Sequence, residues 1–486
     1  MNKIIITTAL LLSGCATKNQ PTENSAIPAP EYHEAYEVYP GMAGNGISKH
    51  LVRSHTTAIL VRPGSSAVEL CSRGVGQIYD WMRRLETRLI KFPALQEQSM
   101  PDAVMGPDSM DMDEWEAYLD RLTGTPSTTA DIEFLIDGEP FYTSLIQSIE
   151  SARSCIDIQT YLFDNDDVAR RVADLLRARS QEIEIRIIYD GLGTYLSHSA
   201  TAPSQPDDTE FIENMPRYLC EGSNIRLRVV PNIWLSGNHV KSMIFDRQVA
   251  YIGGMNIGRE YRHDWHDMMI LLEGRAVEVL SKNFNSTWRH SGWGGDFALL
   301  FPEPSKPYHH KIEGEIPIRF LSTLPTAAQI YRAQLEAIRR ARAYIYIENC
   351  YFSDDRILYE LCRARKRGVD VRVIIPAVVN HKIMENSNKI AINTLLEHGA
   401  RVYLYPRMSH VKAAVYDGWA CVGTANFDKL SLQIIRELNI ATSHPETVQN
   451  LIEKLFEADF NHSTEIKEPI SLDLTDHLIE LIADEI

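Results

Sequence analysis

The chain of 486 residues is long enough for two or three ordinary domains with substantial hydrophobic cores. Because 44% of the residues are hydrophobic and 23% are charged, most of the chain is expected to be globular rather than disordered. The formal net charge of -16 argues against non-specific nucleic-acid binding, since no basic excess is available to displace phosphate counterions.

Residues 1–15 have the pattern of an export signal. Lys3 precedes the apolar run from Ile4 to Leu12, which is too short to span a bilayer as a helix. The small residues that follow end at Cys15, and this pattern resembles the lipobox of bacterial lipoproteins, in which the cysteine is acylated. With Ala16 rather than Asp after this cysteine, the sequence resembles lipoproteins that are sent on to the outer membrane. We therefore expect a lipid-anchored, periplasm-facing protein of the bacterial cell envelope, with an ordinary secretion signal or a disordered N-terminus as the alternatives.

The next segments are expected to link this anchor to the folded part. Residues 16–55 contain prolines among polar residues, which predicts a flexible tether, and residues 56–130 are expected to form a helical extension. Within the extension, helical spacing predicts a basic amphipathic helix over Gly74–Phe92 that packs on its own domain rather than on a membrane. The acidic, Met-rich stretch Pro101–Asp120 is expected to be a poorly ordered connection. No later segment has the character of a transmembrane helix.

Six further cysteines follow the lipobox. An even number would permit disulfides in an oxidising compartment, but most lie in apolar runs, where cysteine usually behaves as a small buried hydrophobe. No CxxC pair is present, so we predict no cysteine-based metal site. These residues are Cys71, Cys155, Cys220, Cys350, Cys362 and Cys421.

A long internal repeat begins near residue 131. The stretch Ala152–Tyr161 is echoed by Ala341–Asn349, and Leu176–Ile188 is echoed by Cys362–Ile375. In each copy a helical end leads into an alternating, β-branched strand, which indicates α/β units. We therefore predict two similar lobes, at residues 131–305 and 306–486, that pack around a shared centre.

Each lobe contains one copy of the pattern His-x-Lys-x4-Asp. Alternation along an extended strand places the histidine and the lysine on one side, where both can face one ligand. Two such pairs suit a phosphodiester: the lysines neutralise developing charge, one histidine attacks phosphorus, and the other protonates the leaving oxygen. We expect the aspartates to close the strand ends structurally, and no metal is required. The motif residues are His239, Lys241, Asp246, His410, Lys412 and Asp417.

A tight segment of small residues follows each motif, at residues 253–256 and 423–426. We expect their glycine backbones and polar side chains to bind the substrate phosphate, with Gly254, Asn256, Thr424 and Asn426 as the candidates. A carboxylate then follows at a nearly equal offset in each copy, Asp267 and Glu437. We expect these acids to orient the two histidines, and the sequence leaves open which histidine each one serves.

Three further patterns identify a resemblance to the phospholipase D superfamily and, within it, to the cardiolipin synthase branch. They are Tyr-Ile-Gly-Gly-x-Asn-Ile at 251–257, Trp265-x-Asp267, and Gly-Thr-x-Asn-Phe-Asp at 423–428. The resemblance covers roughly residues 131–460. It implies two α/β lobes with pseudo-twofold symmetry, each a mixed sheet flanked by helices, with one active site between them. It also implies a ping-pong transfer of a phosphatidyl group, with His239 as the nucleophile and His410 as the acid and base.

The chain departs from that family in two respects. Leu430 and Ile435 stand where the family often has an arginine and an asparagine, whereas Ser431 and Glu437 are retained. The loss of these polar groups bears on recognition of the acceptor or headgroup more than on phosphate chemistry. The branch also commonly has N-terminal transmembrane helices, which the lipid anchor and tether would replace here.

These observations predict a phosphatidyltransferase or phospholipase D that needs no cofactor. Its partners would be a phospholipid, such as phosphatidylglycerol or phosphatidylethanolamine, an alcohol or water as acceptor, and the membrane reached through the anchor. One alternative is a phosphodiesterase or nuclease of the same superfamily, although the acidic charge argues against nucleic acid as a partner. Another is a non-catalytic lipid-binding lipoprotein.

Some chemically suggestive residues have simpler interpretations. His263, Asp264, His266 and Asp267 resemble a metal cluster, but their spacing fits no common zinc pattern, so we predict a polar loop that positions Asp267. The pair at 309–310, two histidines, is expected to lie in the linker between the lobes. Several aromatic residues near strand ends would contact acyl chains or belong to the core. They are Trp234, Tyr261, Trp265, Tyr351 and Phe352.

Overall fold

The computed structural model describes residues 47–74, 109–191, 202–212, 214–231, 237–292, 294–300, 313–325, 327–380 and 382–472. The lipobox at Cys15, nearly all of the helix expected over Gly74–Phe92, Trp234 and the histidine pair at 309–310 lie outside these ranges. Within the described ranges, no helix has both the length and the apolar character that crossing a membrane requires.

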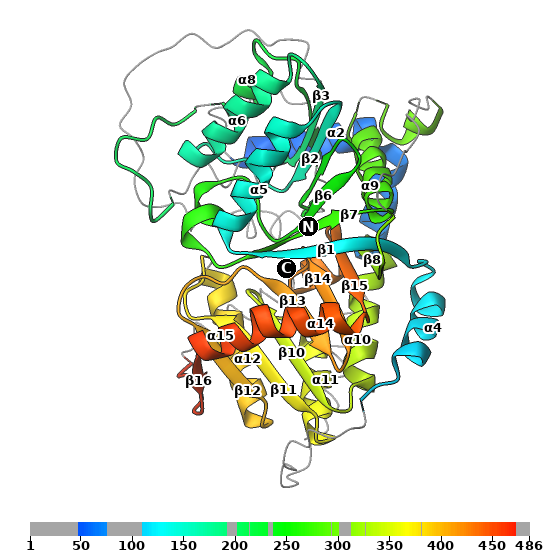
Figure 1. Ribbon diagram of the computed structural model, residues 1–486, viewed down its shortest axis with the longest axis vertical. Coiled ribbons are helices and arrows are strands. Elements are labelled where there is room, and N and C mark those ends of the chain that lie inside the picture. Colours follow the sequence, from blue (N-terminus) through cyan, green and yellow to red (C-terminus); the bar gives the residue numbers. More distant parts are fainter. Residues whose placement is uncertain are drawn as a thin grey trace.

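The first lobe is built on a mixed sheet with helices on both faces (Figure 1). Strands β2, β3 and β4 run parallel to one another, and the remaining neighbours are antiparallel. The strand order is β1 (Thr128–Ile136), β7 (Met268–Glu273), β6 (Val249–Gly253), β5 (Ser242–Phe245), β2 (Cys155–Thr160), β3 (Glu184–Asp190) and β4 (Arg226–Val230). Its helices are α5 (Gly138–Ser151), α6 (Asp167–Arg179), α8 (Met215–Cys220), η1 (Glu260–Asp264), α9 (Ala276–Ser291) and η2 (Gly295–Leu300).

The second lobe repeats this order. The strands are β8 (Ile316–Leu324), β15 (Glu437–Thr442), β14 (Trp419–Gly423), β13 (Lys412–Tyr416), β10 (Tyr344–Asn349), β11 (Asp370–Pro376) and β12 (Arg401–Tyr405), with β16 (Thr464–Ile466) added beside β12 and β9 (Ala327–Ala328) beside β8. The helices are α10 (Gln329–Arg340), α11 (Asp355–Lys366), α12 (Lys382–Glu397), α13 (Lys429–Gln433), α14 (Pro445–Leu451), η3 (Ile452–Glu457) and α15 (Ala458–His462). Two mixed sheets flanked by helices confirm the predicted fold class.

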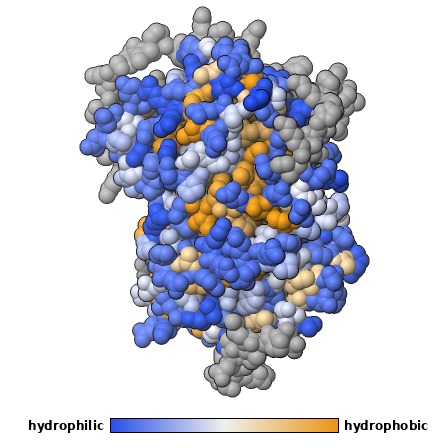
Figure 2. Space-filling model, viewed as in Figure 1, coloured by the Kyte–Doolittle hydropathy of each residue, from blue (hydrophilic) through white to orange (hydrophobic). Residues whose placement is uncertain are grey.

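The two sheets join edge to edge into one continuous sheet. Strands β1 and β8 pair antiparallel, with Thr128 opposite Ile318 and Ala130 opposite Ile316. The first lobe therefore begins at β1, slightly before the predicted boundary at residue 131. Hydrophobic side chains also gather on the surface over the middle of the molecule in Figure 2.

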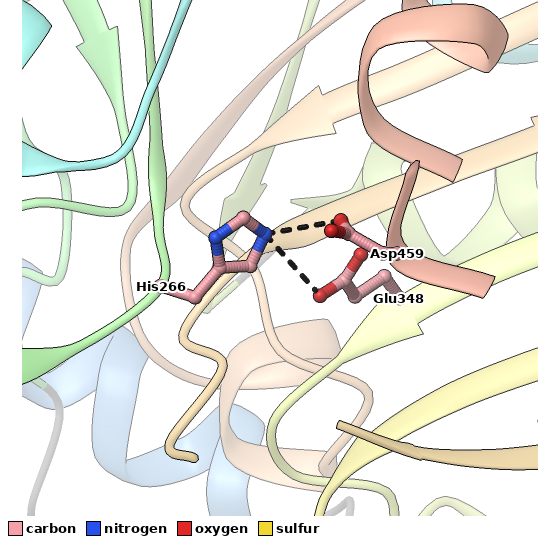
Figure 3. Close-up of side chains that lie close together, drawn as sticks. All are labelled: His266, Glu348 and Asp459. Atoms are coloured by element: carbon pink, nitrogen blue, oxygen red, sulfur yellow. Dashed lines mark hydrogen bonds and ion pairs between the residues drawn. The ribbon is translucent and has the colours of Figure 1, made fainter. Parts of the chain in front are cut away.

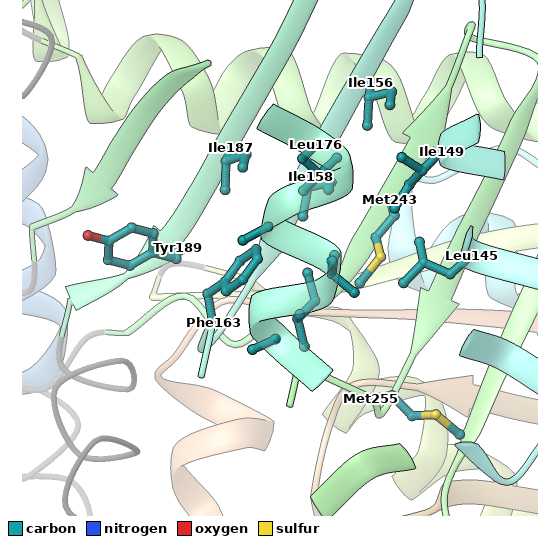
Figure 4. Packing of buried hydrophobic residues seen from close by; sticks show 14 of the residues in the cluster. Leu145, Ile149, Ile156, Ile158, Phe163, Leu176, Ile187, Tyr189, Met243 and Met255 are labelled. Carbon is teal, nitrogen blue, oxygen red and sulfur yellow. The ribbon is translucent and has the colours of Figure 1, made fainter. Parts of the chain in front are cut away.

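Alternation along the strands divides the core between the two faces of the sheet. On one face Ile156, Ile158 and Met243 pack against α5, α6 and α8 (Figure 4). Ile244 and Ile252 point to the other face, where they join α9 and side chains from the second lobe in a shared cluster. The period-two pattern thus gives each strand one side for its own lobe and one for the common core.

The N-terminal extension is more regular than expected. Helix α2 (Ile47–Val61) includes the last part of the predicted tether. Helix α4 (Met112–Thr123) replaces much of the predicted connection over Pro101–Asp120, so that prediction is wrong for this part. Asp111 caps α4 by accepting from the backbone N–H of Glu114, and Trp115 packs edge-on against Trp419 with ring centroids 5.2 Å apart. Helix α4 is thus amphipathic: its acidic residues lie on the surface, and its apolar face packs against the second lobe.

Candidate active site

The two motif strands begin beside each other at the boundary between the lobes. The backbone N–H of His239 donates to the carbonyl of Arg436 at 2.9 Å, and that of His410 donates to the carbonyl of His266 at 2.6 Å. The backbone of each histidine is therefore hydrogen-bonded to the residue that precedes the acid of the other lobe's motif. This bridging, seen also between Asn238 and Arg436, brings both halves into one site.

The acids serve the histidines of the opposite lobes. Nδ1 of His239 lies 2.8 Å from Oε1 of Glu437, and Nδ1 of His410 lies 2.7 Å from Oδ2 of Asp267. All four side chains are buried, with His239 the most exposed at 9%. The sequence left open which histidine each acid serves, and in the structure each acid contacts the histidine of the other lobe. This arrangement also assigns substrate chemistry to Nε2 of each ring, because Nδ1 is engaged by a carboxylate.

The motif lysines lie deep behind the histidines. Nζ of Lys241 donates to the carbonyl of His239 at 2.8 Å, and Nζ of Lys412 donates to the carbonyl of His410. Lys241 is fully buried and Lys412 nearly so. Two buried ammonium groups beside two histidines favour an anionic ligand, since such charges are costly without a partner.

Burial shifts the proton equilibria of these groups. It lowers the pKa of His239 well below its usual range, with a further contribution from Lys241 and Lys412. It lowers the pKa of Lys241 to about 7, and raises those of Asp267 and Glu437 to about 7 and about 8. His239 is therefore neutral near pH 7, the state in which an imidazole nitrogen is nucleophilic.

The small-residue segments support the acids. A Cβ on Gly254 would lie 2.0 Å from Oδ1 of Asp267, so the glycine makes room for that carboxylate. At the equivalent position, the hydroxyl of Thr424 donates to Oε2 of Glu437 at 2.5 Å. The phosphate-binding role expected for Gly254 and Thr424 stays a prediction.

The two asparagines are also committed to the protein. Oδ1 of Asn256 accepts from the Thr160 hydroxyl at 3.0 Å, and its amide nitrogen donates to the Tyr261 hydroxyl at 2.8 Å. Oδ1 of Asn426 accepts from the Cys350 thiol at 3.1 Å. Asn256 therefore holds the end of β2 through its carbonyl oxygen and one amide N–H, and its expected contact with the substrate phosphate stays a prediction.

The motif aspartates lie at the far ends of their strands, away from the histidines. Asp246 accepts from the backbone N–H groups of residues 153–155, and Asp417 from those of Met110 and residues 342–344. Both adopt a positive φ, 52° and 54°, at the hairpin that follows the strand. Both aspartates thus lie where the sequence analysis expected a structural role, at the ends of the motif strands.

Aromatic rings surround the histidines. Tyr261 and Trp265 pack beside His410, with ring centroids 5.6 and 5.2 Å from the imidazole. By contrast, Phe352 is fully buried against Phe427 in the second core. The expected aromatic set thus divides into residues that shape the site and residues that fill the core.

Sequence reasoning missed two residues at equivalent positions directly after β2 and β10. The ring of Tyr161 packs edge-on to His239 at 4.8 Å, and Nζ of Lys241 lies 5.3 Å from its centroid. In the second lobe Cys350 takes this place, and its sulfur accepts from Nζ of Lys412 at 3.4 Å. Alignment of the two repeats would have located both. The other cysteines of the described ranges are free thiols as well, and only Cys71 among these is exposed.

The residues considered as a metal cluster, in η1 and directly after it, do not gather as a group. Asp267 faces a histidine, His410, whereas His263 is exposed on η1. Oδ2 of Asp264 accepts from the backbone N–H of Ser204 at 3.3 Å. His266 instead points toward two acids of the second lobe, Glu348 and Asp459 (Figure 3).

A two-lobed α/β fold with a histidine and lysine from each lobe in one buried site defines an enzyme of the phospholipase D superfamily. Residues 145–288 and 335–460 match the family described as "Cardiolipin synthase, PLD-like domain", and the chain belongs to this family.

Individual relatives agree with this assignment. The chain is 28% identical over 354 residues to cardiolipin synthase 1 of Bacillus anthracis, covering 69% of this chain and 67% of that protein. It is 29% identical over 342 residues to cardiolipin synthase of Listeria monocytogenes serotype 4a (strain HCC23), covering 67% and 68%. Among solved structures, phosphatidylserine synthase of Haemophilus influenzae Rd KW20 has a similar fold, with a TM-score of 0.55 at 14% identity, covering 76% of this chain and 96% of that one.

Proposed function

We propose that the protein transfers the phosphatidyl group of a membrane phospholipid to an alcohol, as a cardiolipin synthase-like enzyme. The single observation that carries this proposal is the crossed pair of histidine–acid contacts beside two buried lysines. Family membership and the similarity to cardiolipin synthases favour a phospholipid over other phosphodiesters.

In the proposed first half-reaction, Nε2 of His239 attacks phosphorus and forms a P–N bond. The bond from phosphorus to the headgroup oxygen breaks, and a proton from Nε2 of His410 passes to the leaving alkoxide. Lys241 and Lys412 would offset the charge on the non-bridging oxygens. Glu437 would stabilise the charge that the His239 ring gains, and the choice of His239 over His410 rests on the resemblance to the family.

In the second half-reaction, Nε2 of His410 takes the proton of the acceptor hydroxyl. The acceptor oxygen attacks phosphorus, and the P–N bond to His239 breaks, which restores both rings. Asp267 would stabilise the imidazolium that forms at each transfer to His410. Water can replace the alcohol, so the balance between transfer and hydrolysis depends on how well the site excludes water.

We further propose that Cys15 is lipidated and holds the enzyme at the periplasmic side of the envelope, preferably at the outer membrane. The lipobox pattern supports this location. Phosphatidylglycerol and phosphatidylethanolamine are the substrates to test first. Radiolabelling with palmitate is expected to mark the native chain and not a Cys15→Ala variant.

Product analysis tests the activity. The protein is incubated with phosphatidylglycerol or phosphatidylethanolamine, with and without added alcohol, and phosphatidic acid and transfer products are followed. We expect a new phosphatidyl ester that increases with alcohol concentration. Unchanged lipids with a folded wild-type protein would refute the proposal, and cleavage of DNA without turnover of lipid would establish the nuclease alternative.

Quenching with a denaturant at alkaline pH during turnover tests the nucleophile. A base-stable phosphohistidine is expected at His239 and absent from a His239→Ala variant. Recovery of the label at His410 would reverse the assignment.

A further inference from the structure

A second buried cluster joins the lobes beside the active site (Figure 3). His266 comes from the loop before β7, Glu348 from β10 and Asp459 from α15. Their ligand atoms lie within 4.8 Å of one another. Nε2 of His266 is 3.0 Å from Oδ2 of Asp459 and 3.9 Å from Oε1 of Glu348. Three potential metal ligands from both lobes thus converge on one point.

The cluster carries more negative charge than its protein partners offset. His266 can supply one positive charge at most, and its Nδ1 already contacts Oδ1 of Asp137 at 2.8 Å, a carboxylate that Arg407 also contacts at 3.2 Å. Only part of the positive charge of a His266 imidazolium is therefore left to offset the negative charges of Glu348 and Asp459. Two buried carboxylates in such surroundings require a proton or a cation.

One oxygen of the cluster lacks a hydrogen-bond partner. Oε1 of Glu348 accepts from the hydroxyl of Ser409 at 2.5 Å, whereas Oε2 is buried and accepts no hydrogen bond. In Figure 3 the carboxylate of Glu348 is directed toward that of Asp459. An unsatisfied, fully buried carboxylate oxygen that faces a second carboxylate is the feature that a bound cation would explain.

The equivalent position in the first lobe shows that the fold does not require this acid. Gln159 occupies the same place in β2 that Glu348 occupies in β10. Its amide nitrogen donates to Oδ1 of Asn238 at 3.1 Å, so a neutral pair occupies this place, and Oε1 of Gln159 is buried without a hydrogen-bond partner as well. The acid in the second lobe therefore calls for an explanation beyond folding.

We propose that His266, Glu348 and Asp459 bind a divalent transition-metal ion, Zn²⁺ or Mn²⁺. Nε2 of His266 and one oxygen from each acid would be the protein ligands, with water completing the coordination. Asp137 at Nδ1 gives the carboxylate–histidine arrangement that fixes the tautomer of a ligating imidazole. Ligands bound at about 2.0–2.2 Å lie roughly 3 Å apart when adjacent, which matches the His266–Asp459 distance.

The ion would fasten the lobes together next to the catalytic groups. His266 directly precedes Asp267, and its carbonyl accepts from the backbone N–H of His410 at 2.6 Å. Ser409, which holds Glu348, directly precedes His410. Binding would thus stabilise the placement of His410 and Asp267 without contact with the substrate.

Metal binding by the full chain tests this proposal. After dialysis against EDTA, Mn²⁺ is titrated and followed by electron paramagnetic resonance, and Zn²⁺ by calorimetry. We expect one ion per chain and a rise in Tm on loading. Glu348→Gln, which copies the first lobe, and Asp459→Asn should each weaken binding roughly tenfold or more. His263→Gln, which alters an exposed histidine of the neighbouring helix η1, should bind as the wild type does.

The results of the metal-binding experiment can be distinguished from those of the lipid assay. No ion at saturating concentrations, or equal binding by wild type and both carboxamide variants, would overturn the proposal and leave a shared proton between the acids. If neither variant folds, the wild type still decides: spin-echo modulation from an imidazole nitrogen bound to Mn²⁺ supports the site, and its absence refutes it.

Discussion

Nδ1 of His239, in the first lobe, lies 2.8 Å from Oε1 of Glu437, in the second. The reciprocal contact joins His410 to Asp267 at 2.7 Å. Each catalytic unit is therefore assembled from both halves of the chain. Because the strand segment before each acid bridges to the segment before the other lobe's histidine, the exchange follows from the way the sheets meet.

The crossed contacts predict which step each acid supports. Glu437→Gln should slow formation of the phosphoenzyme at His239, and Asp267→Asn should slow protonation of the leaving group and activation of the acceptor at His410. We expect losses of about 10²- to 10⁴-fold in kcat, because the carboxamide disturbs the tautomer and cannot stabilise an imidazolium. Rapid-quench measurement of the burst and steady-state phases distinguishes the two steps.

Nitrogen NMR of the histidine rings provides the control. Glu437→Gln should shift the ring signals of His239 more than those of His410, and Asp267→Asn should do the opposite. The reverse pattern would contradict the crossed arrangement.

Gly254→Ala should abolish most activity, since the new Cβ would lie 2.0 Å from Oδ1 of Asp267 and displace it from His410. A loss of about 10²-fold or more in kcat/KM is expected. Gly418→Ala is the matched control, because its Cβ would meet only the flexible side chain of Met112 at 3.6 Å. Equal activity of the two variants would show that Asp267 has room to move.

Activity should depend on the charge of Lys241. Burial lowers the pKa of this ammonium from 10.5 to about 7, so a rise in pH through that value removes the charge from the free enzyme. We expect kcat/KM to fall above about pH 7, and kcat to fall at higher pH because a bound phosphate favours the ammonium. Lys241→Arg, which stays charged, should keep its own activity up to pH 9. A flat kcat/KM profile of the wild type to pH 9 would contradict this explanation.

Asp417→Asn should reduce stability rather than the rate of catalysis. Asp417 is buried and accepts hydrogen bonds from four backbone N–H groups, whereas an asparagine would present its own NH₂ to some of them. The free energy of unfolding should fall by about 3 kcal/mol, measured by urea denaturation. Asp246→Asn should lower the free energy of unfolding by less, about 1 kcal/mol, because Asp246 is half-exposed.

The kinetics of the folded fraction test the same point. For both variants kcat should stay within about twofold of the wild type, because neither aspartate reaches the histidines. A large drop in kcat for a stably folded Asp417→Asn protein would return this residue to the catalytic set.

Much of the fold could be predicted from the sequence, because strands and repeats produce local patterns of hydrophobic residues. The alternation in β2 and β10, and its recurrence in both halves, indicated two α/β lobes with a histidine and a lysine on one side of each motif strand. Helix α4 was missed because its buried face, centred on Trp115, is short and is surrounded by acidic residues. Its contacts with the second lobe, among them that of Trp115 with Trp419, make the helix favourable.

The sequence by itself determined the chemical groups of the active site, since each motif is a short run whose side-chain directions follow from strand geometry. Only the tertiary structure decided that Glu437 serves His239, that Gly254 and Thr424 support the acids, and that His266 meets Glu348 and Asp459. These contacts join segments far apart in the chain. They depend on the antiparallel meeting of β1 and β8, which local periodicity does not encode.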